Sequence, residues 1–299
     1  MHPRLDPPGL PGTRSLLTAL VLACLLPAVL GATLLFGHEY RAGRDNLDRD
    51  TVQTARALTQ AMDNQLLTAQ AIGQVLASSA VLAQGDLATF HRRARDAVAA
   101  AGSVTNVVLI DPDLRQVLNT AVDYGAPLPG APNPDTSRRV FADGRGFISG
   151  LQLSQLFKRP VVGVEVPVVL EGRTAYALRV SLLAQQLDGL LQAQGLPPDW
   201  VAGVLDSSGT IVARTHAADQ FVGHKAGPQL LGAMSAATAG TTEATTRDGI
   251  PVLSSFSCSP ATKWCVVIGI PRQALLGGLA RTLSTLAAGV ALLLALGWV

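Results

Sequence analysis

The chain is poor in cysteine, in aromatic residues and in charge. Three cysteines among 299 residues cannot build the dense disulfide framework of a small secreted domain. Aromatic residues make up 4% and charged residues 15% of the chain, whereas soluble domains usually carry about 25% charged residues. The formal net charge is only +2, without a basic face or an RNA-binding motif, so nucleic acid is not expected as a partner.

Catalytic motifs are missing as well. The sequence has no P-loop, no dinucleotide-binding fingerprint, no nucleophile elbow and no zinc-protease motif. His216 and His224 have no acidic residues or cysteines paired with them in sequence, so we interpret both as loop or surface residues. We therefore expect no catalytic residues, no metal and no cofactor in this part of the protein.

The charges are missing above all from two stretches near the ends. Residues 15–37 contain no charged residue and can cross a bilayer, which takes about 20 apolar residues in a helix. A cleaved signal peptide and a lipoprotein signal at Cys24 are the alternatives. However, the apolar region of a signal peptide usually has about 7–15 residues, and this one continues well past Cys24. We predict a transmembrane helix at 15–37 after a cytoplasmic tail at 1–14.

A second apolar stretch, residues 275–299, is also predicted to span the membrane. Its only charged residue is Arg281, near its start, and because the chain ends inside it we expect the protein to continue beyond Val299. Basic residues on both sides of the first span leave the orientation open, but large domains translocate largely regardless of such charges. We expect a two-pass protein of the inner (cytoplasmic) membrane with residues 38–274 in the periplasm.

Cys258 and Cys265 are the two cysteines of this middle region. They bracket Ser-Pro-Ala-Thr-Lys-Trp, a sequence typical of a turn between two strands, so their side chains could face each other. A disulfide could persist there outside the cytoplasm. We favour this disulfide over the alternative of two buried thiols.

A long helix is predicted from about residue 38 to residue 78. Apolar residues recur there every three or four positions, as on the buried face of a helix: Leu58, Met62, Leu66, Ala69, Ile72 and Leu76. After a break at 78–85, Asp86 is placed to cap a second helix that ends at Gly102. The basic run that starts at His91 in this helix is interpreted as a solvated face.

After Val104 the apolar residues follow the period of strands. Strands are predicted at 104–110, 115–120, 147–153, 160–170 and 174–182, with a turn at Asp111 and a short helix at 135–142. A linker helix follows at 185–194. The same plan then repeats, since Asp206 follows Asp111 by 95 residues and Thr215 follows Thr120 by the same interval. This second copy contains a hairpin from Trp200, a helix at 228–236, and strands at 240–246, 251–257 and 264–270. The repeat indicates two modules of one architecture.

This order of elements resembles the double-Cache family of extracytoplasmic sensors. The resemblance rests on the first span, the long helix, the hairpins VVLIDPDLRQVLNT and AGVLDSSGTIVART, and the ending FSCSPATKWCVVIGIPRQAL before the second span. It implies an α+β fold with two tandem PAS-like modules of antiparallel sheet on a long stalk helix, flanked by two transmembrane helices. It also implies that a small molecule binds in the membrane-distal module. The expected parts are the tail (1–14), the first span (15–37), the stalk and second helix (38–103), the distal module (104–184), the linker (185–198), the proximal module (199–274) and the second span (275–299).

The resemblance also suggests where a ligand would bind. Amino-acid sensors of this family use a Tyr, Arg and Trp group and an Asp on the last distal strand. Here Arg138, Arg139 and Phe141 stand near the place of the Arg and the aromatic residue, the distal module has no Trp, and Arg179 falls about where the Asp would be. An arginine repels an ammonium group but pairs with a carboxylate. We expect Arg138, Arg139 and Arg179 to converge on a small organic acid rather than an amino acid, unless they are surface cations of an unliganded module.

Three further residues complete the predicted site. Lys158 and Arg159, in the loop before the central strand, could add positive charge, and Tyr124 could close the pocket or simply pack in its loop. The sequence thus predicts the ligand-sensing region of a homodimeric transmembrane signalling receptor, with a histidine kinase or diguanylate cyclase output beyond Val299. The alternatives are a membrane-anchored binding or scaffold module without output, and an envelope enzyme.

Overall fold

The computed structural model describes residues 46–274 together with 284, 288 and 289. The tail and the two spans predicted at 15–37 and 275–299 lie outside the described residues, apart from those last three positions. Within the described part of the chain, no helix is both long enough and apolar enough to cross a membrane. Residues Thr51–Leu275 form one compact unit.

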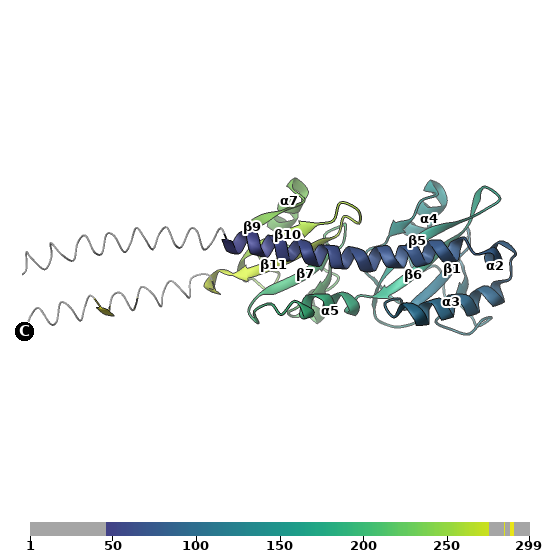
Figure 1. Ribbon diagram of the computed structural model, residues 1–299, viewed down its shortest axis with the longest axis horizontal. Coiled ribbons are helices and arrows are strands. Elements are labelled where there is room, and N and C mark those ends of the chain that lie inside the picture. Colours follow the sequence, from purple (N-terminus) through teal and green to yellow (C-terminus); the bar gives the residue numbers. More distant parts are fainter. Residues whose placement is uncertain (1–45, 275–283, 285–287, 290–299) are drawn as a thin grey trace, which may run out of the picture. The chain divides into compact units, whose positions relative to one another are not determined.

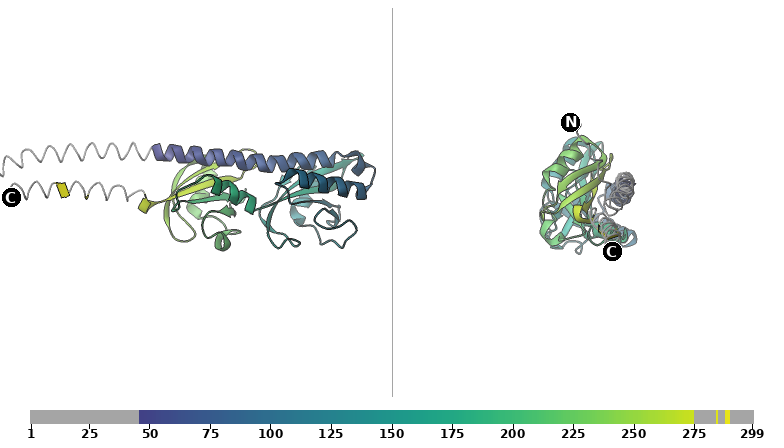
Figure 2. Two further views of the ribbon diagram at one scale, coloured as in Figure 1. Left: turned by 60° about the horizontal axis from the view of Figure 1, so that its bottom comes forward. Right: turned by 90° about the vertical axis from the view of Figure 1, so that its left-hand side faces the viewer.

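A long helix covers residues 46–77 and contacts both sheets of the fold (Figures 1 and 2). The predicted apolar face is confirmed, since Leu58, Met62, Leu66, Ala69 and Leu76 are buried. At Gly73 the helix approaches the first sheet so closely that a Cβ atom would lie 3.2 Å from Val166 and Val180. At Thr59 the side-chain hydroxyl donates a hydrogen bond to the carbonyl of Ser257 in the second sheet, at 3.0 Å.

Two helices follow the long one. The predicted break at 78–85 contains a short helix that was not expected, α2 (Ala80–Ala83). The second predicted helix is confirmed as α3 (Leu87–Ala101), where the Asp86 carboxylate accepts a hydrogen bond from the Thr89 amide at 3.0 Å. Gly102 follows the helix with a φ of 63°, a conformation that glycine adopts without strain.

The first sheet is antiparallel and has the order β2-β1-β6-β5-β3, with β4 also paired to β5. Its strands are β1 (Asn106–Ile110), β2 (Gln116–Asn119), β3 (Phe147–Ile148), β4 (Gln152–Leu153), β5 (Pro160–Leu170) and β6 (Arg173–Leu183). The strand predicted at 147–153 is therefore two short strands. Helix α4 (Pro134–Asp143) lies against β5 and β6. We call β1–β6 with α4 the first module.

The second sheet is also antiparallel and has the order β8-β7-β11-β10-β9. Its strands are β7 (Val201–Leu205), β8 (Ile211–Arg214), β9 (Ala239–Thr245), β10 (Pro251–Cys258) and β11 (Cys265–Pro271). Helix α5 (Gln185–Ala193) joins the sheets, and α6 (Ala218–Phe221) and α7 (Pro228–Ala236) accompany the second one. We call β7–β11 with α6 and α7 the second module.

The 95-residue repeat appears in the hydrogen bonds as well as in the elements. The Thr120 hydroxyl oxygen accepts a hydrogen bond from the Val107 amide at 2.9 Å, and 95 residues later Thr215 accepts one from Ala202 at the same distance. Both hairpins have a register shift at the same place, between residues 109 and 110 and between 204 and 205. The fold is thus α+β with a long helix and two related antiparallel sheets.

Cys258 and Cys265 lie opposite each other where β10 pairs with β11. They form a disulfide with an S–S distance of 2.08 Å. The pairing runs from Val252 and Pro271 at the open end of the hairpin to the two cysteines, so the disulfide lies at its turn end.

Candidate functional site

One face of the first sheet is apolar and packs against the long helix, while the other face carries a buried polar group. On this second face, Val108, Ile110 and Ala177 pack against Val140 of α4. Beside them lies a pocket of about 50 Å³. Its polar lining residues are Asn106, Gln116, Asn119, Gln152, Ser154, Gln155, Arg179 and Ser181. We call this the first-module pocket, and its volume is enough for several water molecules or for part of a small ligand.

Arg179 and Glu165 form the charged centre of this face. They are direct partners across β6 and β5, and both side chains are 0% exposed. The Arg179 Nη1 donates to Glu165 Oε1 at 2.8 Å. The Ser137 hydroxyl on α4 donates to the other carboxylate oxygen at 2.9 Å, so α4 is tied to the ion pair. Two opposite charges are therefore held together away from water.

The other edge of the Arg179 guanidinium is held by uncharged groups. Its Nη2 donates to Gln152 Oε1 at 2.9 Å and to the Ser149 hydroxyl at 3.2 Å. Its Nε is buried and has no hydrogen-bond partner among the described residues. A buried donor without a partner is costly and rare in folded proteins. Arg179 itself is one of the residues that line the first-module pocket.

Gly163 makes room for the guanidinium. A Cβ atom at this position would lie 2.0 Å from Arg179 Cζ, so no side chain other than hydrogen fits there. Gly163 is also the partner of Ser181 across β5 and β6. The glycine in the middle of an otherwise apolar strand therefore has a direct function in placing Arg179.

A chain of carboxamide groups forms another wall of the pocket. Asn106 Nδ2 donates to Asn119 Oδ1 at 2.9 Å, and Asn119 Nδ2 donates to Gln116 Oε1 at 2.8 Å. Gln116 Nε2 in turn donates to the Gly130 carbonyl at 2.7 Å. Such groups can both donate to and accept from a ligand, so this wall suits a polar molecule.

Burial raises the pKa of Glu165 above its ordinary value, and the Arg179 and Ser137 groups oppose this rise. The carboxylate therefore depends on Arg179 to stay ionised. If a ligand took over the guanidinium, Glu165 would take up a proton more readily. A ligand that bound at Arg179 would thus change the pKa of this carboxyl group.

The structure does not bring the three predicted arginines together. Arg179 lines the pocket, but Arg138 is exposed and pairs with Asp135 at 2.7 Å. Arg139 is exposed too, with its guanidinium carbon 4.1 Å from the centre of the Phe147 ring. Helix α4 turns these two side chains outward because Ser137 and Val140, on its other face, are the buried residues. Phe141 is partly buried and packs against the apolar residues beside Val140.

The remaining predicted residues lie around the pocket and not in its lining. Lys158 and Arg159 are exposed in the turn between β4 and β5, where their backbone groups bond to those of Ser154. Tyr124 is 52% exposed, with its ring centre 5.8 Å from that of His91. The interpretation of His91 as part of a solvated face is wrong, because its side chain is buried and its Nε2 lies 3.0 Å from the Val122 carbonyl oxygen.

Sequence analysis missed Glu165 and the carboxamide wall. A signal for Glu165 was present, since it is the one charge in the apolar run Val161–Val169 of a strand expected to be buried. Its partner could not be found without the register of β5 on β6. The carboxamide residues carry no comparable signal, because asparagine and glutamine are ordinary in turns and at strand ends. Among the described residues, no cluster of His, Cys, Asp and Glu could hold a metal ion.

No family model and no curated protein matches the chain. Solved structures with the same fold are found. The ligand-binding domain of Mlp24 with asparagine is 14% identical, with a TM-score of 0.59, and the match covers 81% of this chain and 99% of that one. The ligand-binding domain of the Campylobacter jejuni chemoreceptor Tlp3 in complex with L-valine is 12% identical, with a TM-score of 0.57 and coverages of 79% and 97%. The periplasmic sensory domain of the Campylobacter jejuni chemoreceptor Tlp1 is 12% identical, with a TM-score of 0.61 and coverages of 78% and 98%.

These similarities extend over almost the full length of each matched domain. At such low identities they establish the fold and leave the ligand of this chain open. The chain therefore has the same fold as these sensory domains, and in this chain that fold consists of two related antiparallel sheets on one long helix.

Proposed function

We propose that this chain is the extracytoplasmic ligand-sensing region of a transmembrane signalling receptor, with residues 38–274 in the periplasm between spans at 15–37 and 275–299. Its output would be of the histidine kinase or diguanylate cyclase type. The fold supports this proposal, since domains that share it belong to chemoreceptors and histidine kinases. In this proposal the first module, 104–184, is membrane-distal, the linker is 185–198, and the second module, 199–274, is membrane-proximal.

We further propose that the first-module pocket binds a small organic acid. The observation that carries this is the buried Arg179 Nε, which has no partner among the described residues and belongs to a residue that lines the pocket. A ligand carboxylate there would complete the hydrogen bonds of the guanidinium. The carboxamides of Asn106 and Asn119 would bind further oxygen atoms of the ligand.

An amino acid fits this pocket less well. Its ammonium group needs a carboxylate or several carbonyl acceptors, and none of the described residues that line the pocket is an Asp or a Glu. Glu165 lies behind the guanidinium, with one oxygen bonded to Arg179 and the other to Ser137. Because the Mlp24 and Tlp3 structures contain amino acids, amino acids are also included in the ligand screen described below.

The long helix is the element that could carry the signal. It contacts β5 and β6 of the first sheet at Gly73 and the second module at Thr59 and Asp63, whose carboxylate accepts a hydrogen bond from the Thr262 hydroxyl at 2.8 Å. A ligand shifts this helix only if it binds one arrangement of the pocket better than another. Strand β6 carries both Arg179 and Val180, and Val180 contacts the long helix at Gly73. A ligand that displaced Arg179 would therefore also displace the helix contact on the opposite face of the same strand.

The test is a thermal-shift screen of the purified protein against organic acids and amino acids. We expect an organic acid to raise the melting temperature and the variant R179M/E165Q to lose this response. The double variant removes both charges, so that neither remains buried alone. The exposed Arg138→Ala variant is the control and should respond like the wild type. Stabilisation by amino acids only, or an unchanged response of R179M/E165Q, would remove the proposed ligand class and site.

The coupling to Glu165 gives an independent check. Because a ligand carboxylate at Arg179 favours protonation of Glu165, binding takes up a proton and the affinity should rise as the pH is lowered over the range in which the protein stays folded. Calorimetric titrations in buffers with different ionisation enthalpies measure this uptake directly. An affinity that is constant over this range would show that the ligand leaves the ion pair intact.

A further inference from the structure

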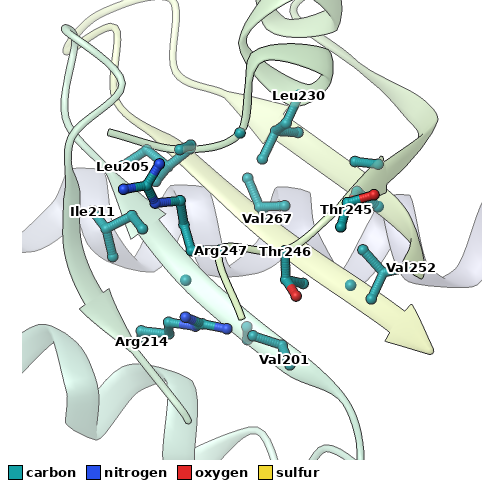
Figure 3. Close-up of a pocket in the computed structure, with 17 residues that line it drawn as sticks. Val201, Leu205, Ile211, Arg214, Leu230, Thr245, Thr246, Arg247, Val252 and Val267 are labelled. Carbon is teal, nitrogen blue, oxygen red and sulfur yellow. The ribbon is translucent and has the colours of Figure 1, made fainter. Parts of the chain in front are cut away.

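The second module has a pocket of its own on the face that corresponds to the first-module pocket. It is lined mainly by aliphatic side chains, among them Val201, Leu205, Ile211, Leu230, Val252 and Val267, and has a volume of about 70 Å³ (Figure 3). We call it the second-module pocket. It shares no lining residue with the first-module pocket, so it is a separate site.

A buried arginine lines this apolar pocket. Arg214 lies at the end of β8, 95 residues after Asn119, which lines the first-module pocket from the corresponding strand. Its side chain is only 5% exposed. Its guanidinium carbon lies 4.5 Å from the centre of the Phe221 ring, which holds the group in place from one side. A cation in such surroundings needs partners for its donors.

The guanidinium of Arg214 is only half satisfied. Its Nη2 donates to Asp248 Oδ1 at 2.7 Å. Its Nη1 is buried and has no hydrogen-bond partner in the described part of the chain. Burial alone would raise the pKa of Asp248, but hydrogen bonds from Arg214 and Thr246 hold the pKa below its usual value, so Asp248 is ionised. One edge of the guanidinium thus has its carboxylate and the other edge has none.

The charges around the pocket favour an anion. Arg247 also lines it and is exposed, and in the view of Figure 3 it lies on the same side as Arg214, across from Thr245 and Val252. Among the described residues that line the pocket, the charged ones are Arg214 and Arg247, both cations. No Asp or Glu is among the described residues that line the pocket, so an ammonium group would find no charged partner there.

We propose that the second-module pocket binds a short aliphatic monocarboxylate. The ligand carboxylate accepts hydrogen bonds from Arg214 Nη1, opposite Asp248, and the hydrocarbon tail is buried among the aliphatic side chains. A guanidinium has five N–H donors in a planar fork, so it can hold one carboxylate on each edge. A dicarboxylate would have to bury its second charge against aliphatic groups, which is unfavourable.

Small residues provide the space for the tail. Ala226, which lines the pocket, is 8% exposed and belongs to the same apolar cluster as Leu205, Leu230 and Val267. A larger side chain at this position would occupy the volume of the ligand and leave Arg214 unchanged. This gives a variant that tests the pocket without removing a charge.

The experiment is a titration of the full chain with isovalerate, followed by calorimetry, with isovaleramide as the uncharged ligand of matching shape. We expect isovalerate to bind the wild type, and isovaleramide to bind at least about 10-fold more weakly because it lacks the charge-assisted hydrogen bonds. The Arg214→Met and Ala226→Leu variants should each weaken isovalerate binding by at least the same factor. The control variant Arg138→Ala, at an exposed residue that lines neither pocket, should bind isovalerate like the wild type.

Three results would overturn the proposal. The first is that neither isovalerate nor the shorter propionate and butyrate bind to the wild-type chain at millimolar concentrations. The second is that isovalerate and isovaleramide bind equally well, which would exclude Arg214 as an anion partner. The third is that Arg214→Met and Ala226→Leu both bind isovalerate as the wild type does, which would place the ligand elsewhere. Because the readout is binding alone, it does not depend on whether the first module senses a ligand.

Discussion

Replacing Glu165 by glutamine should destabilise the protein strongly, because the change leaves the charge of Arg179 buried and without a carboxylate. Both side chains are 0% exposed, and the other hydrogen-bond partners of Arg179, Ser149 and Gln152, carry no charge. Breaking a buried ion pair from one side typically costs about 3–5 kcal/mol, more than the pair itself contributes. Glutamine keeps the shape of glutamate, so packing is not the cause of this loss.

The double variant R179M/E165Q isolates the electrostatic part. It removes both charges, so its loss of stability should be smaller than that of E165Q alone, since an uncharged replacement of a buried pair is often close to neutral. The measurement is urea-induced unfolding followed by circular dichroism. The control is Asp113→Asn. Its partner Arg115 is 70% exposed, so this variant should leave the stability nearly unchanged. An E165Q variant within about 0.5 kcal/mol of the wild type would refute the description of a buried, mutually dependent pair.

Three further changes have defined outcomes. Gly163→Ala places a Cβ atom 2.0 Å from Arg179 Cζ, so this variant should lose at least about 1–3 kcal/mol of stability in urea unfolding. It should also abolish the ligand response in the thermal-shift screen, and an unaltered response would contradict the role of this glycine. Loss of the disulfide, either in the double variant C258S/C265S or by reduction of the wild type, should lower the stability by about 2–3 kcal/mol. Equal unfolding midpoints with and without reductant would count against the bond. Burial raises the pKa of Asp188 although a backbone N–H opposes it, so the folded state holds this proton more tightly and stability falls as the pH rises through the folded pKa. Asp188→Asn should therefore raise the melting temperature at pH 7 and not at about pH 3, whereas the same gain at both pH values would exclude the carboxylate as the cause.

The fold could be predicted from the sequence largely because its signals are local and repeated. The apolar period of 46–77, the cap at Asp86 and the 95-residue spacing of the two hairpins each describe neighbours along the chain, and the structure has all of them. The strand predicted at 147–153 was too long because the Gly163 amide donates to the Ser149 hydroxyl oxygen, although the Ser149 amide still donates to the Gly163 carbonyl. A hydrogen bond made by one side chain leaves no periodic pattern in the sequence, so it could not be predicted.

The site could be predicted only in part. Arg179 was expected to line the ligand pocket, and it does line the pocket of the first module. Glu165 neutralises Arg179 because the register of β5 on β6 places the two residues opposite each other. A register shift of one residue would turn the side chains of one strand to the other face of the sheet. Arg138 and Arg139 were expected to converge with it, but the direction of a helix face is set by which residues pack beneath it, here Ser137 and Val140.

The central claim is that occupancy of the first-module pocket changes the arrangement of the long helix. The direct measurement uses single cysteines at the exposed positions Ala57, Asn64 and Ala71 in a Cys24→Ser background, with disulfide cross-linking between receptor copies. With the organic acid from the thermal-shift screen, we expect the cross-linking rate at one or more of these positions to change, and the change to disappear in the double variant that lacks the buried ion pair. Equal rates with and without a ligand that demonstrably binds would contradict the account.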